Sequence, residues 1–191
     1  YRQERPREEQ LAAKSALFFA RYGQLFGLTD PATELQLTAT YTSTYAFTDL
    51  TYAQSYAGVP VFGGILRTHF DASGKLTAVN GIAVPIAAIN TTPTLQSEAA
   101  EAVARAAVQA TYTTVGEPLQ VIATQLYIFQ PELLKGRNGP LYLAYRIEIA
   151  NPAYTIRRFV FIDAHTGKVL LSLNGVHELE REISEGSLNN K

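Results

Sequence analysis

The clearest pattern of apolar and polar positions in the chain lies between Leu50 and Pro85, and it predicts three consecutive strands. The first strand shows period-two alternation, with the larger residues at every second position, namely Tyr52, Gln54 and Tyr56. Gly58 interrupts this strand, and the apolar residues of 61–70 predict a second one. Residues 71–75 predict a turn before the third strand, because Asp bonds its own backbone and Gly tolerates positive φ.

A helix is predicted before this region. Residues 11–26 have helical periodicity, and Gly27 is suited to end the helix. The residues predicted to share its apolar face are Leu11, Phe18, Tyr22, Leu25 and Phe26. Residues 1–10 are rich in charge and are predicted to be frayed, whereas the alternation in 35–41 predicts a strand.

A second helix and four further strands are predicted in the C-terminal half. Ser97 is the predicted N-cap of a helix that ends near Thr111, with Glu98 and Glu101 in its first turn. Its predicted apolar stripe is Val103, Ala106, Ala107 and Ala110. The predicted strands are 119–129, 141–149, 157–163 and 168–173, and the second of them alternates cleanly, with one face formed by Leu143, Tyr145, Ile147 and Ile149.

An internal echo divides the chain into two units. Residues 69–76, followed by Asn80-Gly81, are mirrored by residues 161–169, followed by Asn174-Gly175. Each copy closes a unit that begins with a helix and continues into antiparallel strands. The sequence therefore predicts an α+β fold of two tandem units, each a helix packed on an antiparallel sheet, with the other face of the sheet turned to solvent or to a partner.

The central stretch also carries a family resemblance. The string Gln-Ser-Tyr-Ala-Gly-Val-Pro-Val-Phe-Gly at 54–63 precedes a set of spaced residues, namely His69, Asp71, Gly74, Val79, Asn80 and Gly81. Together they resemble the core motif of the FTP (fungalysin/thermolysin propeptide) domain. Residues 142–149, 159–164 and 166–170 resemble a PepSY domain. FTP followed by PepSY is the arrangement of the pro-regions of thermolysin-like zinc metallopeptidases.

This resemblance implies a domain organisation and a function. It implies a cystatin-like fold with an FTP domain at 8–88, a linker at 89–96, a PepSY domain at 97–177 and a tail at 178–191. Such a pro-region is expected to assist folding of a thermolysin-like catalytic domain, in cis or in trans, and to inhibit it. It is expected to be secreted, with a signal peptide removed before Tyr1. The absence of Met fits a segment of a longer precursor.

The resemblance and the tyrosines suggest two surfaces for the partner. The first is the motif itself, comprising Tyr52, Gln54, Tyr56, Gly58, Val59, Pro60, Val61, Phe62 and Gly63. Tyr52 and Tyr56 fit either a core or an exposed docking face, and the alternation leaves both open. The second is the charged tail, which would approach the partner's zinc through His177, Glu178, Glu180, Glu182 or Glu185.

Composition excludes several other functions. A net charge of −1 gives no electrostatic basis for binding nucleic acid or an anionic membrane, and no apolar run has the length of a spanning helix. The absence of Cys excludes thiolate sites. His177-Glu178 begins the zinc motif H-E-x-x-H, but Arg181 stands where the second His belongs. We therefore expect no catalytic residue, metal or cofactor in this chain, and zinc only in the partner. The alternative is an autonomous secreted inhibitory or peptide-binding module without a peptidase of its own.

Overall fold

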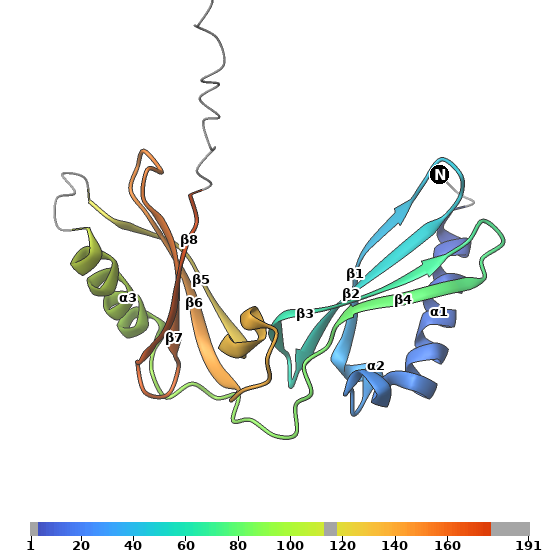
Figure 1. Cartoon of the computed structure of the whole chain (residues 1–191), viewed down its shortest axis with the longest axis horizontal. Coiled ribbons are helices and arrows are strands. Elements are labelled where there is room, and N and C mark those ends of the chain that lie inside the picture. Colours follow the sequence, from blue (N-terminus) through green and yellow to red (C-terminus); the bar gives the residue numbers. More distant parts are fainter. Residues whose placement is uncertain (1–3, 113–117, 177–191) are drawn as a thin grey trace, which may run out of the picture.

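The structure is a computed structural model that describes residues 4–112 and 118–176. In this part of the chain, two helix-and-sheet units form a V (Figure 1). The N-terminal unit consists of α1 (Glu4–Tyr22), η1 (Gly23–Phe26), α2 (Pro31–Glu34), β1 (Leu35–Thr42), β2 (Thr48–Tyr56), β3 (Val59–Phe70) and β4 (Leu76–Ile82). The C-terminal unit consists of α3 (Ser97–Thr111), β5 (Gln120–Phe129), η2 (Pro131–Lys135), β6 (Tyr142–Ala150), β7 (Arg157–Asp163) and β8 (Val169–Asn174).

Each unit contains a four-stranded antiparallel meander, β1 to β4 and β5 to β8. A single parallel bridge, from Val61 in β3 to Ile128 in β5, joins the two meanders into one eight-stranded sheet. The long helices α1 and α3 lie on the outer sides of the V, so the helix-free faces of the two meanders turn toward each other (Figure 1). The predicted α+β class, with a helix on a sheet twice in tandem, is confirmed.

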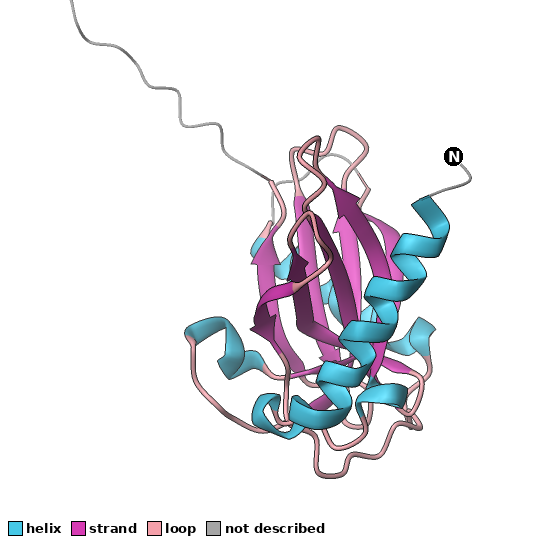
Figure 2. Ribbon diagram, turned by 90° about the vertical axis from the view of Figure 1, so that its right-hand side faces the viewer, coloured by secondary structure: helices cyan, strands magenta, loops and turns pink. Residues whose placement is uncertain are grey.

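Helix α1 lies across the N-terminal sheet (Figure 2) and buries a narrower stripe than predicted. Leu11, Ser15 and Phe19, spaced four residues apart, are its buried residues. Tyr22 and Leu25 were assigned to this face, but they are 39% and 83% exposed. Leu25 lies in the 3₁₀ turn that follows the end of the α-helix at Tyr22, and this turn changes the angle between successive side chains. Tyr22 instead packs its ring against the partly buried Phe18, at a centroid distance of 5.1 Å.

The start of α1 is also earlier than predicted. The helix begins at Glu4, so the prediction of a frayed segment up to Gln10 was wrong for the described residues. Arg7 donates hydrogen bonds of 3.0 Å to the carbonyl oxygens of Ala46 and Ala72. These two loops follow β1 and β3, so the contact holds the first turns of α1 against the end of the sheet.

Helix α3 ends where predicted, at Thr111, but its stripe is shifted. Its buried residues are Ala100, Ala104 and Val108, with Val103 partly buried beside them. Ala106 and Ala110 are exposed. The predicted stripe was wrong because alanines occur all around this helix, so the sequence alone does not show which side the sheet covers.

The start of α3 differs from the prediction at Ser97 and Glu101. The N-cap is Gln96, without a side-chain capping bond, so Ser97 is the first helical residue. Glu101 lies one turn into the helix and accepts a 2.6 Å hydrogen bond from the hydroxyl of Thr124 in β5. The side chain of Glu101 therefore connects α3 to β5, whereas the prediction was a favourable interaction with the helix dipole.

The C-terminal core agrees with the predicted alternation of β6. The face predicted to be apolar, formed by Leu143, Tyr145, Ile147 and Ile149, is buried against α3. The two turns of the internal echo also form as predicted. Asp71 accepts hydrogen bonds from the backbone N–H groups of Ser73 and Lys75, and Asp163 accepts them from those of His165 and Thr166. Among the described helices, none is long and apolar enough to cross a membrane.

Candidate interaction surface

The motif residues begin on β2 and turn back into β3 through a two-residue hairpin. Its central residues, Ala57 and Gly58, have φ of 48° and 80°. Positive φ at both positions is the signature of a type I′ turn, whose twist matches that of the flanking strands. A Cβ added at Gly58 would meet nothing within 4 Å, so this glycine is required by the backbone conformation and its side is open.

Gln54 acts as an internal clamp. Its amide oxygen accepts a 2.8 Å hydrogen bond from the backbone N–H of Val84, and its amide nitrogen donates to the carbonyl of Val84 at 2.8 Å. The same nitrogen lies 3.3 Å from Oε2 of Glu34, whose other carboxylate oxygen, Oε1, accepts 2.7 Å hydrogen bonds from the N–H groups of residues 29 and 30. Because Gln54, Glu34 and Val84 are all buried, Gln54 satisfies backbone groups that water does not reach.

Residues 61–64 leave the N-terminal sheet and join it to the other unit. Ala53 pairs with Ile65 and Ser55 pairs with Pro60, so four residues of β3 bulge out opposite Gln54. Gly63 has φ of 79°, and a Cβ at Gly64 would lie 2.8 Å from the Cβ of Gln54. The bulge therefore needs both glycines. A strand interrupted by adjacent glycines is a sequence signal for a bulge, and the prediction of one continuous strand passed over it.

The bulge places Phe62 on the helix-free face of the C-terminal sheet. Its ring centroid lies 4.9 Å from that of Phe161 and 5.6 Å from those of Phe129 and Tyr127, with near-perpendicular planes. Phe129 and Phe161 stack on each other at 4.0 Å. Aromatic pairs in such geometries add to the free energy of burying their area. The motif phenylalanine is thus a contact between the two units.

Tyr52 belongs to the core of the N-terminal unit. Its ring packs edge-on against Phe19 of α1 at 5.4 Å. Burial raises the pKa of the Tyr52 phenol, an effect that the hydroxyls of Ser15 and Thr68 partly offset. Those two hydroxyls share a buried 2.9 Å hydrogen bond. Tyr52 and the buried Gln54 therefore belong to the core of the N-terminal unit and not to an exposed sheet face.

Most of the remaining motif residues also pack against other residues of this chain. Val61 is buried beside Val84 and Ile128, and Tyr56 and Val59 pack partly against this cluster. Pro60 and Phe62 are half-buried, whereas Gly58 and Gly63 are exposed. The motif thus forms the junction of the two units, with the hairpin tip as its accessible part.

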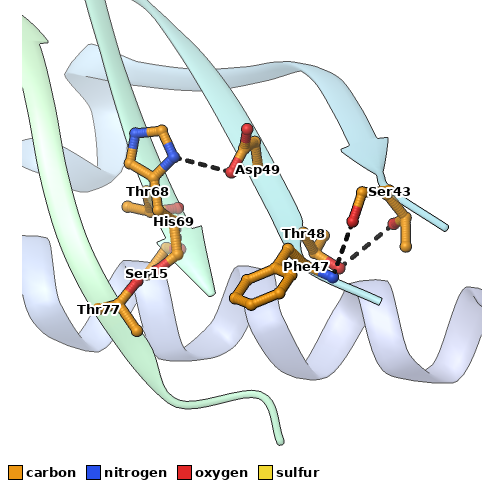
Figure 3. A network of polar contacts seen from close by, with 9 residues as sticks. Ser15, Ser43, Phe47, Thr48, Asp49, Thr68, His69 and Thr77 are labelled. Atoms are coloured by element: carbon orange, nitrogen blue, oxygen red, sulfur yellow. Dashed lines mark hydrogen bonds and ion pairs between the residues drawn. The ribbon is translucent and has the colours of Figure 1, made fainter. Parts of the chain in front are cut away.

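The helix-free face of the N-terminal sheet is more open than the motif. Ile65 and Ile82 form a cross-strand pair on it and are 42% and 49% exposed. Beside them, the Nδ1 atom of His69 lies 2.7 Å from a carboxylate oxygen of Asp49 (Figure 3). Arg67 extends between these two pairs and is exposed. Apolar and charged side chains side by side are typical of a surface that binds another protein.

The opposite wall, on the C-terminal sheet, carries an ordered set of charges. The guanidinium carbon of Arg146 lies 4.2 Å from the ring centroid of Phe159, and that of Arg157 lies 5.0 Å from it. Arg157 also donates a 2.7 Å hydrogen bond to the carboxylate of Glu148. Two cations held on one aromatic ring give this wall a defined polar pattern.

The described residues contain no group of three or more His, Asp or Glu side chains placed to hold a metal ion. His69 pairs with Asp49, and the ring of His165 lies 3.2 Å from the hydroxyl of Thr94. His177 and the tail glutamates, Glu178, Glu180, Glu182 and Glu185, lie outside the described residues.

Comparisons with known proteins gave one family match and a similar solved structure. No curated protein sequence matched the chain. Among solved structures, the C-terminal domain of Bacillus megaterium YpeB aligns with 87% of this chain at 13% sequence identity and a TM-score of 0.40. The aligned part is 64% of the YpeB chain. A family model, the Fungalysin/Thermolysin Propeptide Motif, matches residues 33–82, which span β1 to β4. The Fungalysin/Thermolysin Propeptide Motif therefore lies in the N-terminal unit.

Proposed function

We propose that this chain is the pro-region of a secreted thermolysin-like zinc metallopeptidase, and that it acts as an intramolecular chaperone and inhibitor of the catalytic domain. The single observation that carries the proposal is the match of the propeptide motif to residues 33–82. In this proposal the second unit is a PepSY domain, the unit boundaries fall at 8–88 and 97–177, and the zinc belongs to the partner.

The physical basis of both activities is preferential binding. A pro-region that binds the native catalytic domain and not its unfolded chain stabilises the native state by linkage. Tethering in one precursor raises the effective concentration, so a modest intrinsic affinity suffices in cis, and a higher affinity is needed in trans. We propose that the catalytic domain contacts the two helix-free faces, since most motif side chains pack against other residues of this chain.

The test is an inhibition assay with a thermolysin-like peptidase, best the one encoded with this segment. Hydrolysis of a peptide substrate is measured with increasing amounts of the chain, of a form lacking 176–191, and of an Ile65→Asp, Ile82→Asp double variant. The matched control is Leu17→Asp, at a 73% exposed position of α1 on the outer side of the V.

Each result assigns the inhibitory element. Inhibition that is lost only in the truncated form places it in the tail, and inhibition lost only in the double variant places it on the sheet face. A folded chain that leaves the peptidase fully active at a large molar excess would overturn the inhibitor role. Refolding yield of the catalytic domain, measured with and without the chain, tests the chaperone role separately.

A further inference from the structure

Strand β1 has an unprotected edge. It is the outermost strand of the sheet, and no other strand in the described part of the chain pairs with its outer side. Exposed edges are usually blocked by charged residues, proline or a covering segment, because their free N–H and C=O groups pair readily with another strand. The sequence of β1, Leu-Gln-Leu-Thr-Ala-Thr-Tyr-Thr, contains no charge and no proline. Its last five residues, 38–42, are exposed.

A row of three cavities follows this edge, between β1 and α1. The first, of about 500 Å³, is lined by apolar residues that include Phe19, Leu35 and Tyr52. The second, of about 280 Å³, is lined by Glu8, Glu9, Ala12 and Leu37. The third, of about 500 Å³, is lined by Arg7, Glu8, Leu11, Thr40 and Thr42, among others. Each volume is large enough for at least one side chain.

The spacing of the cavities is that of a strand. They occur at residue 35, at residue 37 and at residues 40–42 of β1, with the extra residue accounted for by the bulge between Leu37 and Ala39. The lining of α1 runs in the opposite direction, from residue 20 to residue 7. At about 1.5 Å per helical residue and about 3.3 Å per strand residue, both walls extend for about 20 Å, the length of six or seven extended residues.

The charges of the walls specify the ligand further. Glu8 and Glu9 lie at the middle cavity, and Asp30 lies at the apolar one. Arg7 is the one cation that lines these three cavities in the described residues, and it already donates to two backbone carbonyls. The row therefore favours an apolar side chain at the Phe19 end and a basic side chain two residues away from it.

We propose that the edge of β1 binds an extended peptide as an added strand, with an apolar side chain in the Phe19–Leu35–Tyr52 cavity and a basic side chain beside Glu8 and Glu9. The backbone of the ligand pairs with β1, and its alternate side chains enter the row of cavities, as in strand addition generally. This site lies on the outer flank of the N-terminal unit, so it does not depend on the proposed pro-region function.

The experiment uses two fluorescein-labelled probe peptides and the full chain. The probes are Thr-Val-Thr-Leu-Thr-Lys-Thr and Thr-Lys-Thr-Leu-Thr-Val-Thr, with blocked ends, so that both strand directions are tested. Fluorescence anisotropy is expected to show saturable binding of one of them below about 1 mM. Replacing Lys of that probe by Glu, or Leu by Pro, is expected to weaken binding at least fivefold.

Variants of the chain locate the site. Glu9→Lys is expected to weaken binding of the Lys probe about fivefold and to strengthen that of the Glu probe, since the sign of the pair is exchanged. The matched control, Glu98→Lys, alters an acid in the first turn of α3 and should leave both affinities unchanged. Hydrogen exchange should report added protection in residues 35–42 on binding.

Three results of the binding experiments would overturn the proposal. They are no saturable binding of either probe, an affinity that Glu9→Lys and Glu98→Lys change alike, or protection that appears on strands other than β1. Sedimentation of the free chain tests a further occupant. A dimer that excludes the probe would show that a second copy of the chain occupies this edge, and the peptide assignment would be wrong.

Discussion

Replacing Gln54 by Leu should cost much of the stability of the N-terminal unit. The change leaves the buried N–H and C=O groups of Val84 without their 2.8 Å partners and removes the weaker contact with Glu34. Each buried polar group left without a partner costs about 1–3 kcal/mol, so for the two groups we expect a loss of about 2–6 kcal/mol. A domain is typically stable by only about 5–15 kcal/mol, so the effect is large.

Urea unfolding followed by far-UV circular dichroism measures this loss, since the chain contains no Trp. Hydrogen exchange of Val84 gives a local readout, because its amide proton loses its acceptor. A Gln54→Leu variant within about 1 kcal/mol of the parent, with Val84 still protected, would refute the clamp. It would mean that a neighbouring group or water replaces the amide.

Gln54→Glu separates the role of hydrogen bonding from that of shape. The new carboxyl would face the carboxylate of Glu34 and the carbonyl of Val84, so its folded-state pKa should lie above the unfolded value of about 4.3. A group with a raised folded pKa loses its stabilising contribution as pH rises through that value. The variant should therefore approach parental stability near pH 4 and be destabilised at pH 7. A stability difference that does not change with pH would contradict this reasoning.

Three further predictions follow from single contacts. Phe62→Ala should destabilise the chain by about 2–4 kcal/mol and increase its radius of gyration in small-angle scattering, because the aromatic contact between the units is lost. Ala57→Gly should raise the urea midpoint, with a gain of about 0.5–1 kcal/mol, because glycine removes the strain of the positive φ. Burial alone would raise the pKa of Asp163, but hydrogen bonds from the N–H groups of His165 and Thr166 hold it below its ordinary value. Stability from this carboxylate is thus present above about pH 4 and is lost on further acidification, and Asp163→Asn should flatten the acid limb of a pH–stability curve.

What the sequence predicted well was local. The alternation in β6, the turns at Asp71 and Asp163 and the end of the helical segment α1–η1 at Gly27 each depend on a few neighbouring residues. Alternation within a strand and hydrogen bonding within a turn depend on residues close in the sequence, so contacts with distant residues do not change them. The α+β class followed from the order of such elements.

What it predicted poorly depends on residues far apart in the chain. The stripes of α1 and α3 depend on which side of each helix the sheet covers, and the start of α1 depends on Arg7 reaching Ala46 and Ala72. The clamp joins Gln54 to Val84 across thirty residues. The sequence left both a core and an interface position open for Tyr52, because alternation identifies the two faces of a strand but not the face that a helix covers.

The position of the motif residues changes how they bear on a partner. Gln54 holds the segment that leaves β4, the two glycines shape the bulge, and Phe62 packs on the other unit. These contacts fix how the helix-free faces meet at the base of the V. If the chain binds a catalytic domain through both faces, the motif acts on affinity through their relative orientation, without touching the partner. Phe62→Ala should then weaken inhibition while leaving each unit folded, whereas Ile65→Asp should weaken it with the V unchanged.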